Sequence, residues 1–214
     1  MGRTLDYEGI ELKWINHQAA FRIFKIAGSR VVYIDPWEVE PTGDADAILI
    51  THAHFDHLSP DDVEKLKAAD TTIIGPPDCV AKLKGNIKSI APGQRISAGD
   101  IHIEAVPAYN IKPERQNFHP RKNNWVGYVV DIDGKRIYHA GDTDKIPEMS
   151  GIKCDIALLP AGGTYTMDGA EAGEAANVIK PKIAVPMHWG KVVGSKADVD
   201  NFRKAAKMRV EVLE

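Results

Sequence analysis

The chain has 214 residues, with 27 lysines and arginines against 30 aspartates and glutamates, and a formal net charge of −3 at pH 7. This length is sufficient for a full hydrophobic core, so we expect a single domain over residues 1–214. A slightly acidic chain has no global basic field for nucleic acid or an anionic membrane, so we predict neither as a partner.

The cysteines and the N-terminal residues indicate a compartment. Cys79 and Cys154 lie far apart without C-x-x-C spacing, which is typical of buried or idle thiols in a reducing environment. Residues 1–8 lack the apolar segment of a signal peptide, and no apolar run approaches the roughly 20 residues of a membrane span. We therefore expect a cytoplasmic protein.

The first part of the chain reads mainly as strands, because apolar residues alternate with polar ones or cluster between turn residues. The expected strands cover residues 10–15, 20–26, 31–34, 45–50 and 71–74. A helix is expected over residues 60–66, with Ser59 as its N-cap, Pro60 in its first turn and Asp62 as the acid of a capping box. A shorter helix is expected over residues 78–83.

The second part mixes strands with helices. The expected strands cover residues 101–106, 125–132, 135–139, 155–159, 182–185 and 210–213. Asp133-Gly134 is a strong signal for a hairpin turn. The expected helices cover residues 168–179 and 195–207, and each begins with a capping pair, Asp168 with Glu171 and Ser195 with Asp198.

The most informative segment is residues 51–57, Thr-His-Ala-His-Phe-Asp-His, directly after an expected buried strand. It gathers three of the eight histidines and one aspartate within six positions. Imidazole nitrogen and carboxylate oxygen suit Zn²⁺, Mn²⁺ or Fe²⁺. Residues i and i+2 of an extended segment project to one side, so His52 and His54 can bind one ion. Asp56 and His57 lie beyond it, in position for a second ion.

Two more potential ligands also follow expected strands. Asp142 comes after the strand at 135–139, and His188 comes after residues 182–187. Loops at the same end of a sheet can converge on one point. Taken alone, Asp142 reads as a turn residue and His188 as a packed or surface histidine. Beside the histidine-rich segment, both are candidate metal ligands.

These segments resemble the ligand motifs of the metallo-β-lactamase fold superfamily, namely residues 51–57, Ala-Gly-Asp-Thr at 140–143 and Met-His-Trp-Gly at 187–190. Asp-Pro-Trp at 35–37 and Leu-Pro-Ala-Gly-Gly-Thr at 159–164 are similar to the branch that contains L-ascorbate-6-phosphate lactonase. The resemblance implies an α+β fold, a four-layer αββα sandwich, with a metal site at the open edge between its sheets.

The resemblance also implies which residues hold which ion. His52 and His54 would bind the first metal, Asp142 would bridge both, and the second would be bound by Asp56, His57 and His188. Two ions can share a hydroxide that attacks a phosphorus or carbonyl centre. Asp56, His57 and Asp142 are therefore the predicted catalytic residues. The metal is a divalent ion, and the superfamily pattern predicts two of them.

One departure concerns the third histidine of the first metal. The superfamily commonly supplies it after the strand that corresponds to residues 101–106, where this chain has Asn110. The next histidine is His119. Either His119 completes the site, or Asn110 is a weak oxygen ligand, or the first site is labile. Of these, we favour His119.

The segment 108–124 is longer than an ordinary loop and is typical of a lid or binding loop. It carries Lys112, Arg115, Arg121 and Lys122 against Glu114 alone. A cationic loop beside two metals would suit a small anionic substrate carrying phosphate or carboxylate. A solvated charged loop without a ligand is an equally consistent interpretation.

Together these features predict a metal-dependent hydrolase that uses a metal-bound hydroxide to cleave a phosphodiester or a phosphorylated lactone. The alternative is a metal-binding or ligand-sensing protein of the same fold without turnover. His17 and Asp35 are candidates for supporting the ligands, although Asp35 also reads as a turn residue before a proline. Tyr165 and Trp189 are candidates to border the substrate. The sequence leaves the oligomeric state open, a homo-oligomer included.

Overall fold

The computed structural model describes residues 4–16 and 18–214, in which the strands form two seven-stranded sheets. The first sheet follows chain order: β1 (Thr4–Tyr7), β2 (Ile10–Trp14), β3 (Phe21–Lys25), β4 (Arg30–Ile34), β5 (Ala45–Leu49), β6 (Lys67–Gly75) and β7 (Asn86–Ser89). The second sheet also follows chain order: β8 (Arg95–Ala98), β9 (Ile101–Pro107), β10 (Val126–Ile132), β11 (Lys135–His139), β12 (Ile156–Pro160), β13 (Ile183–Met187) and β14 (Arg209–Val210).

The helices lie on the outer faces of the sheets. They are α1 (Pro60–Leu66), α2 (Pro77–Val80), α3 (Gly169–Ile179) and α4 (Lys196–Ala205), with 3₁₀ turns η1 (Arg121–Asn123) and η2 (Pro147–Gly151). Within the described residues, no helix combines the length and the apolar character that crossing a membrane would demand.

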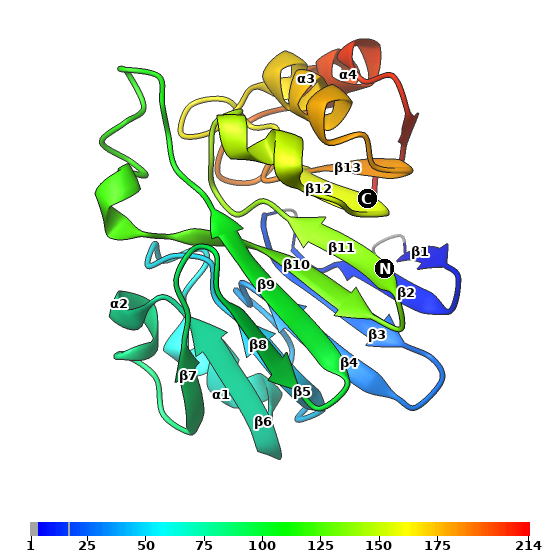
Figure 1. The fold of residues 1–214 in the computed structure, drawn as a ribbon. Coiled ribbons are helices and arrows are strands. Elements are labelled where there is room, and N and C mark those ends of the chain that lie inside the picture. The colour runs from blue at the N-terminus through cyan, green and yellow to red at the C-terminus, as the bar shows by residue number, and fades with distance from the viewer. Residues whose placement is uncertain (1–3, 17) are drawn as a thin grey trace.

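The layers are held by apolar contacts between the sheets and beneath the helices. Leu12 of the first sheet and Tyr128 of the second belong to one cluster of buried residues. Leu66 of α1 belongs to another cluster with Ile48 of β5. On the other side α3 packs on β12 and β13, and α4 packs on α3 (Figure 1). The expected four-layer αββα sandwich is confirmed.

The strands that the sequence pattern does not predict all lie at sheet edges. These are β1, β7 and β8, each at an outer position of its sheet. An edge strand is short and half exposed, so it carries little of the apolar alternation that marks a strand in a sequence. The other edge strand, β14, is shorter than expected and ends at Val210. Val212 and Leu213 are buried but lie outside it.

The N-terminus of α1 differs from its expected capping box. The Ser59 hydroxyl accepts a hydrogen bond from the Asp62 backbone amide at 3.3 Å, as predicted. The Asp62 carboxylate instead accepts the backbone amides of Glu38 and Val39 at 2.9 and 3.2 Å. Asp62 therefore attaches the segment after β4 to α1, a long-range role that local sequence does not reveal. The capping box of α3, from Asp168 and Glu171, is confirmed.

Parallel pairing brings the ends of distant strands together. β4 to β7 run parallel, and so do β11 to β14. The carboxyl ends of parallel strands meet at one edge of a sheet. Asp35 follows β4, residues 51–57 follow β5, Asp142 follows β11 and His188 follows β13. The topology therefore collects the candidate ligands at these edges.

Helix α3 approaches α4 closely at Gly173. A Cβ atom there would lie 2.7 Å from Ala205 Cβ and 2.8 Å from the Phe202 carbonyl oxygen. Both contacts are shorter than ordinary van der Waals separation, and one of them is to backbone. Gly173 therefore permits the spacing of these two helices.

We predict that Gly173→Ala lowers the free energy of unfolding by about 1–3 kcal/mol, because the overpacking outweighs the gain of about 1 kcal/mol in helix propensity. Urea denaturation of the two proteins measures the difference. Gly151→Ala is the control, since its Cβ would meet no heavy atom within 4 Å and the change should stay within about 0.5 kcal/mol. Equal stability of both variants would contradict the close approach.

Candidate metal centre

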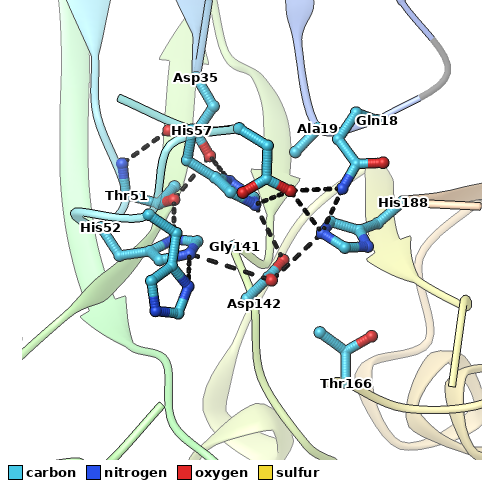
Figure 2. Close-up of polar contacts among 12 residues, drawn as sticks. Gln18, Ala19, Asp35, Thr51, His52, His57, Gly141, Asp142, Thr166 and His188 are labelled. Atoms are coloured by element: carbon cyan, nitrogen blue, oxygen red, sulfur yellow. Dashed lines mark hydrogen bonds and ion pairs between the residues drawn. The ribbon is translucent and has the colours of Figure 1, made fainter. Parts of the chain in front are cut away.

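The side chains predicted as metal ligands lie close together around Asp142, which follows β11, and Figure 2 shows His52, His57 and His188 beside it. They are His52, His54, Asp56, His57, His119, Asp142 and His188. Asp142 Oδ2 lies 3.3 Å from His119 Nε2 and 3.2 Å from His188 Nε2. Asp142 Oδ1 lies 3.4 Å from His57 Nε2.

The ligand atoms divide into two groups on either side of this carboxylate. The atoms of His52, His54 and His119 lie within 4.8 Å of one another, and so do those of Asp56, His57 and His188. Asp142 faces both groups, since its Oδ2 is near His119 in the first and near His188 in the second. Asp142 therefore contacts histidines of both groups.

His119 and Asn110, the two candidates for the third ligand of the first metal, make different contacts. His119 is buried and belongs to the first group of ligand atoms. The Asn110 side-chain amide instead donates to the carbonyl oxygens of Arg115 and Tyr165, each at 2.8 Å. Its backbone amide donates to the His119 carbonyl at 2.9 Å. Asn110 therefore closes the loop that returns His119 to the cluster.

Asp35 orients the histidine-rich segment. Its carboxylate lies 2.8 Å from His57 Nδ1, which confirms the predicted contact with a ligand histidine. It also accepts the backbone amide and the hydroxyl of Thr51, at 2.7 and 2.6 Å. The Thr51 hydroxyl lies 2.9 Å from His52 Nδ1. One buried carboxylate thus holds His57 directly and His52 through Thr51, leaving their Nε2 atoms facing Asp142.

The backbone is also unusual at two of these positions. Asp35 and His188 adopt positive φ angles of 46° and 56°. For residues other than glycine this conformation costs about 1–3 kcal/mol and persists only where surrounding contacts fix it. The hydrogen bond from the His188 amide to the Gln18 carbonyl, at 2.9 Å, is one such contact.

Burial and neighbouring charges set the protonation of the cluster. Burial opposes ionisation of Asp142, but His188 and His57 outweigh it and hold its pKa well below the ordinary value. Burial likewise opposes the His188 charge, yet Asp142 raises the His188 pKa to about 9. Burial, reinforced by His57, keeps the pKa of His52 well below its usual range. Protons on His57 and His188 thus provide the positive charge that the carboxylates require.

A divalent cation fits this set of donors. The buried atoms His57 Nε2, His119 Nε2 and Asp142 Oδ1 have no hydrogen-bond partner within the described residues. Leaving such atoms unpaired costs about 1–3 kcal/mol each. Mixed imidazole and carboxylate ligands suit Zn²⁺, Mn²⁺ and Fe²⁺, and a bound cation would replace the protons of the histidines.

Gln18 contacts the second group of ligand atoms, and the sequence analysis does not identify it. Its Nε2 lies 2.6 Å from Asp56 Oδ2 and 2.7 Å from His188 Nε2. The residue is fully buried between β2 and β3. No sequence pattern marks this glutamine, because its burial and its contacts are visible only in the structure. The neighbouring His17, predicted to support the ligands, lies outside the described residues.

A cavity of about 220 Å³ opens over the cluster. Five of the predicted ligands line it together with Phe55, Phe118, Tyr165 and Val192. Tyr165, a candidate to border the substrate, lies in the wall of this cavity. Trp189 does not, because it is buried against Trp14 with ring centroids 5.4 Å apart.

Three of the four cations of the loop at 108–124, namely Lys112, Arg115 and Arg121, pair with carboxylates of the protein. Arg115 is buried and lies 2.8 Å from Asp144 and 3.0 Å from Glu171. Lys112 also pairs with Glu171, and Arg121 pairs with Glu148 at 3.2 Å. These charges fasten the loop to the rest of the protein. The side chains that line the cavity include none of them.

Replacing Asp35 by asparagine tests the orienting role. Burial lowers the pKa of His57, but Asp142 and Asp35 raise it well above the ordinary value. We predict that Asp35→Asn lowers the pKa of His57, measured by NMR titration of the chelator-treated protein. The free energy of unfolding should fall by about 1–3 kcal/mol, because the amide cannot accept every bond that the carboxylate accepts. Asp61→Asn, at an exposed position, is the control. An unchanged His57 titration would refute the role.

Comparisons with known proteins identify the family of the chain. Residues 11–188 match the family model of the beta-lactamase superfamily domain. A UPF0173 metal-dependent hydrolase of Archaeoglobus fulgidus is 34% identical over 94% of this chain and 92% of its own length. One from Thermococcus onnurineus is 33% identical over 95% of each chain.

Solved structures show the same fold. A crystal structure from Parabacteroides distasonis has a TM-score of 0.85 and 34% identity, covering 99% of this chain and 97% of its own. Igni18, a metallo hydrolase from Ignicoccus hospitalis, has a TM-score of 0.77 and 27% identity, with coverages of 96% and 95%. The chain therefore belongs to the metallo-β-lactamase superfamily, within the UPF0173 family of metal-dependent hydrolases.

Proposed function

We propose that this protein is a hydrolase with a dinuclear metal centre that cleaves a small phosphate-bearing substrate, in the first place a phosphodiester. The observation that carries the proposal is the position of Asp142, 3.3 Å from His119 in one ligand group and 3.2 Å from His188 in the other. His52, His54 and His119 would hold the first ion. The second would be held by Asp56, His57 and His188, with Asp142 shared.

Two divalent ions bound there would lower the pKa of water toward neutrality and supply a hydroxide nucleophile. Asp56 faces the cavity, and its carboxylate can orient the attacking water. Burial opposes its ionisation, but the hydrogen bond from His188 and the charge of His57 lower its pKa to about 2. Asp35 contacts His57 and Gln18 contacts Asp56, and these contacts hold the two candidate ligands in position.

The loop contacts favour a phosphodiester over a phosphorylated lactone. In a phosphodiester the phosphate is the group attacked, so the metals themselves would neutralise it. A phosphorylated lactone carries its phosphate away from the reacting carbonyl and would need a separate cationic contact. Lys112, Arg115 and Arg121 are paired with carboxylates of the protein instead. The resemblance to L-ascorbate-6-phosphate lactonase stays a prediction.

Metal content tests the two-ion centre. After reconstitution with Mn²⁺ or Zn²⁺ and removal of free metal, we expect two equivalents in the intact protein and one in His119→Ala, measured by elemental analysis. His102→Ala removes an exposed histidine and should keep both equivalents. A single equivalent in the intact protein, unchanged by His119→Ala, would indicate a mononuclear centre without His119.

Hydrolysis of bis(4-nitrophenyl) phosphate by the metal-loaded protein tests turnover. We expect Asp142→Asn to lower kcat/KM by at least about 100-fold, because the amide is a poorer bridging ligand than the carboxylate. Asp70→Asn, at an exposed position, should retain activity.

The alternative function, a metal-binding or ligand-sensing protein, predicts a different pair of results. Added metal would then raise the melting temperature of the intact protein, while neither phosphodiesters nor lactones would be hydrolysed. Turnover that survives Asp142→Asn would argue against the proposed centre.

A further inference from the structure

The cavity over the metal centre has apolar walls that are open to solvent. The Phe55 side chain is 67% exposed, and those of Phe118 and Val192 are 38% and 41% exposed. All three line the cavity beside the candidate ligands. Large apolar side chains gathered around a hollow with a few polar groups are typical of a ligand site.

Neighbouring rings hold the two phenylalanines. Phe55 meets Trp37 edge to face, with ring centroids 5.7 Å apart and planes at 84°. Phe118 meets Tyr165 in the same manner at 4.8 Å and 81°. Such pairs add about 0.5–1.5 kcal/mol beyond simple burial, so the walls have a defined shape despite their exposure.

Among the described residues, no lysine or arginine lines the cavity. Lys191, the neighbour of Val192, pairs with Glu38 and lies 4.7 Å from the Trp37 ring centroid. The loop cations Lys112 and Arg115 are held by Glu171. An anionic group placed against Phe55 and Phe118 would therefore lose hydration without gaining a partner, which is costly.

We propose that the substituent of the substrate that lies beside the scissile phosphate is uncharged and apolar, such as an aromatic ring. This inference rests on the proposed function, which assigns the phosphate to the metals. Phe55, Phe118 and Val192 are the specificity-determining residues. The cavity volume of about 220 Å³ is below the usual range for drug-sized ligands, so the substituent is small. Substrates with a second remote phosphate or carboxylate are excluded.

Three phosphonates with the same metal-binding group test this inference by isothermal titration of the metal-loaded protein. They are methylphosphonate, phenylphosphonate and 4-sulfophenylphosphonate. We expect phenylphosphonate to bind at least about 10-fold tighter than either of the others. Phe118→Ala should reduce the advantage of phenyl over methyl several-fold. Ile26→Ala removes an exposed apolar residue in the β3–β4 turn, remote from the cavity, and should leave the affinities unchanged.

Val192→Lys provides a second test, since it adds a cation to the wall without touching a candidate ligand. The inference predicts weaker binding of phenylphosphonate and tighter binding of 4-sulfophenylphosphonate than in the intact protein. Elemental analysis of each variant confirms that its metal content is unchanged.

The outcomes separate this inference from the proposed function. The inference is wrong if methylphosphonate and phenylphosphonate bind equally well, or if 4-sulfophenylphosphonate binds most tightly to the intact protein. In either case, hydrolysis of bis(4-nitrophenyl) phosphate would still support the proposed function. If none of the three binds, the inference is again wrong, and absence of hydrolysis then decides against the function as well.

Discussion

A buried carboxylate among imidazoles is the constraint on which the site depends. Asp142 is almost fully buried and lies within 3.4 Å of nitrogen atoms from three histidines. A charge in that position is strongly unfavourable unless positive charge compensates it. Protonated His57 and His188 can do so, and divalent cations can do so better, because they also satisfy atoms that now lack a partner.

The need to hold buried charges in a fixed arrangement explains why polar residues surround the cluster. Asp35 holds His57 and Thr51, Gln18 contacts Asp56, and Asn110 closes the loop that carries His119. Each of these residues acts on a ligand from a different part of the chain. A site built from several loops needs such side-chain hydrogen bonds, because loops lack the regular backbone hydrogen bonds that fix the position of a helix or a strand.

Most strands and helices and the candidate ligand motif could be predicted because they have local signals, whereas the four layers followed from the resemblance to the superfamily. The candidate ligand motif at 51–57 and the strands around it are compact patterns, and His119 is the next histidine along the chain after Asn110. Gln18 and the true partners of Asp62 could not be predicted in this way. Their contacts join residues more than 20 positions apart, and a single glutamine or aspartate has no periodicity to reveal them.

The loop at 108–124 shows how composition alone misleads about binding. Its positive charges suggested an anion site, but Arg115 is buried between Asp144 and Glu171, and Asp144 also accepts the amides of Ile111 and Lys112 at 2.8 and 2.9 Å. The paired charges anchor the loop so that His119 reaches the cluster of candidate ligands and Phe118 reaches the cavity wall. Three of the four loop cations are paired, and none of the four lines the cavity, so the proposed function assigns recognition of the substrate to the metals and to the aromatic side chains of the cavity wall. A long charged loop near an active site can therefore determine specificity through the apolar residues that it positions.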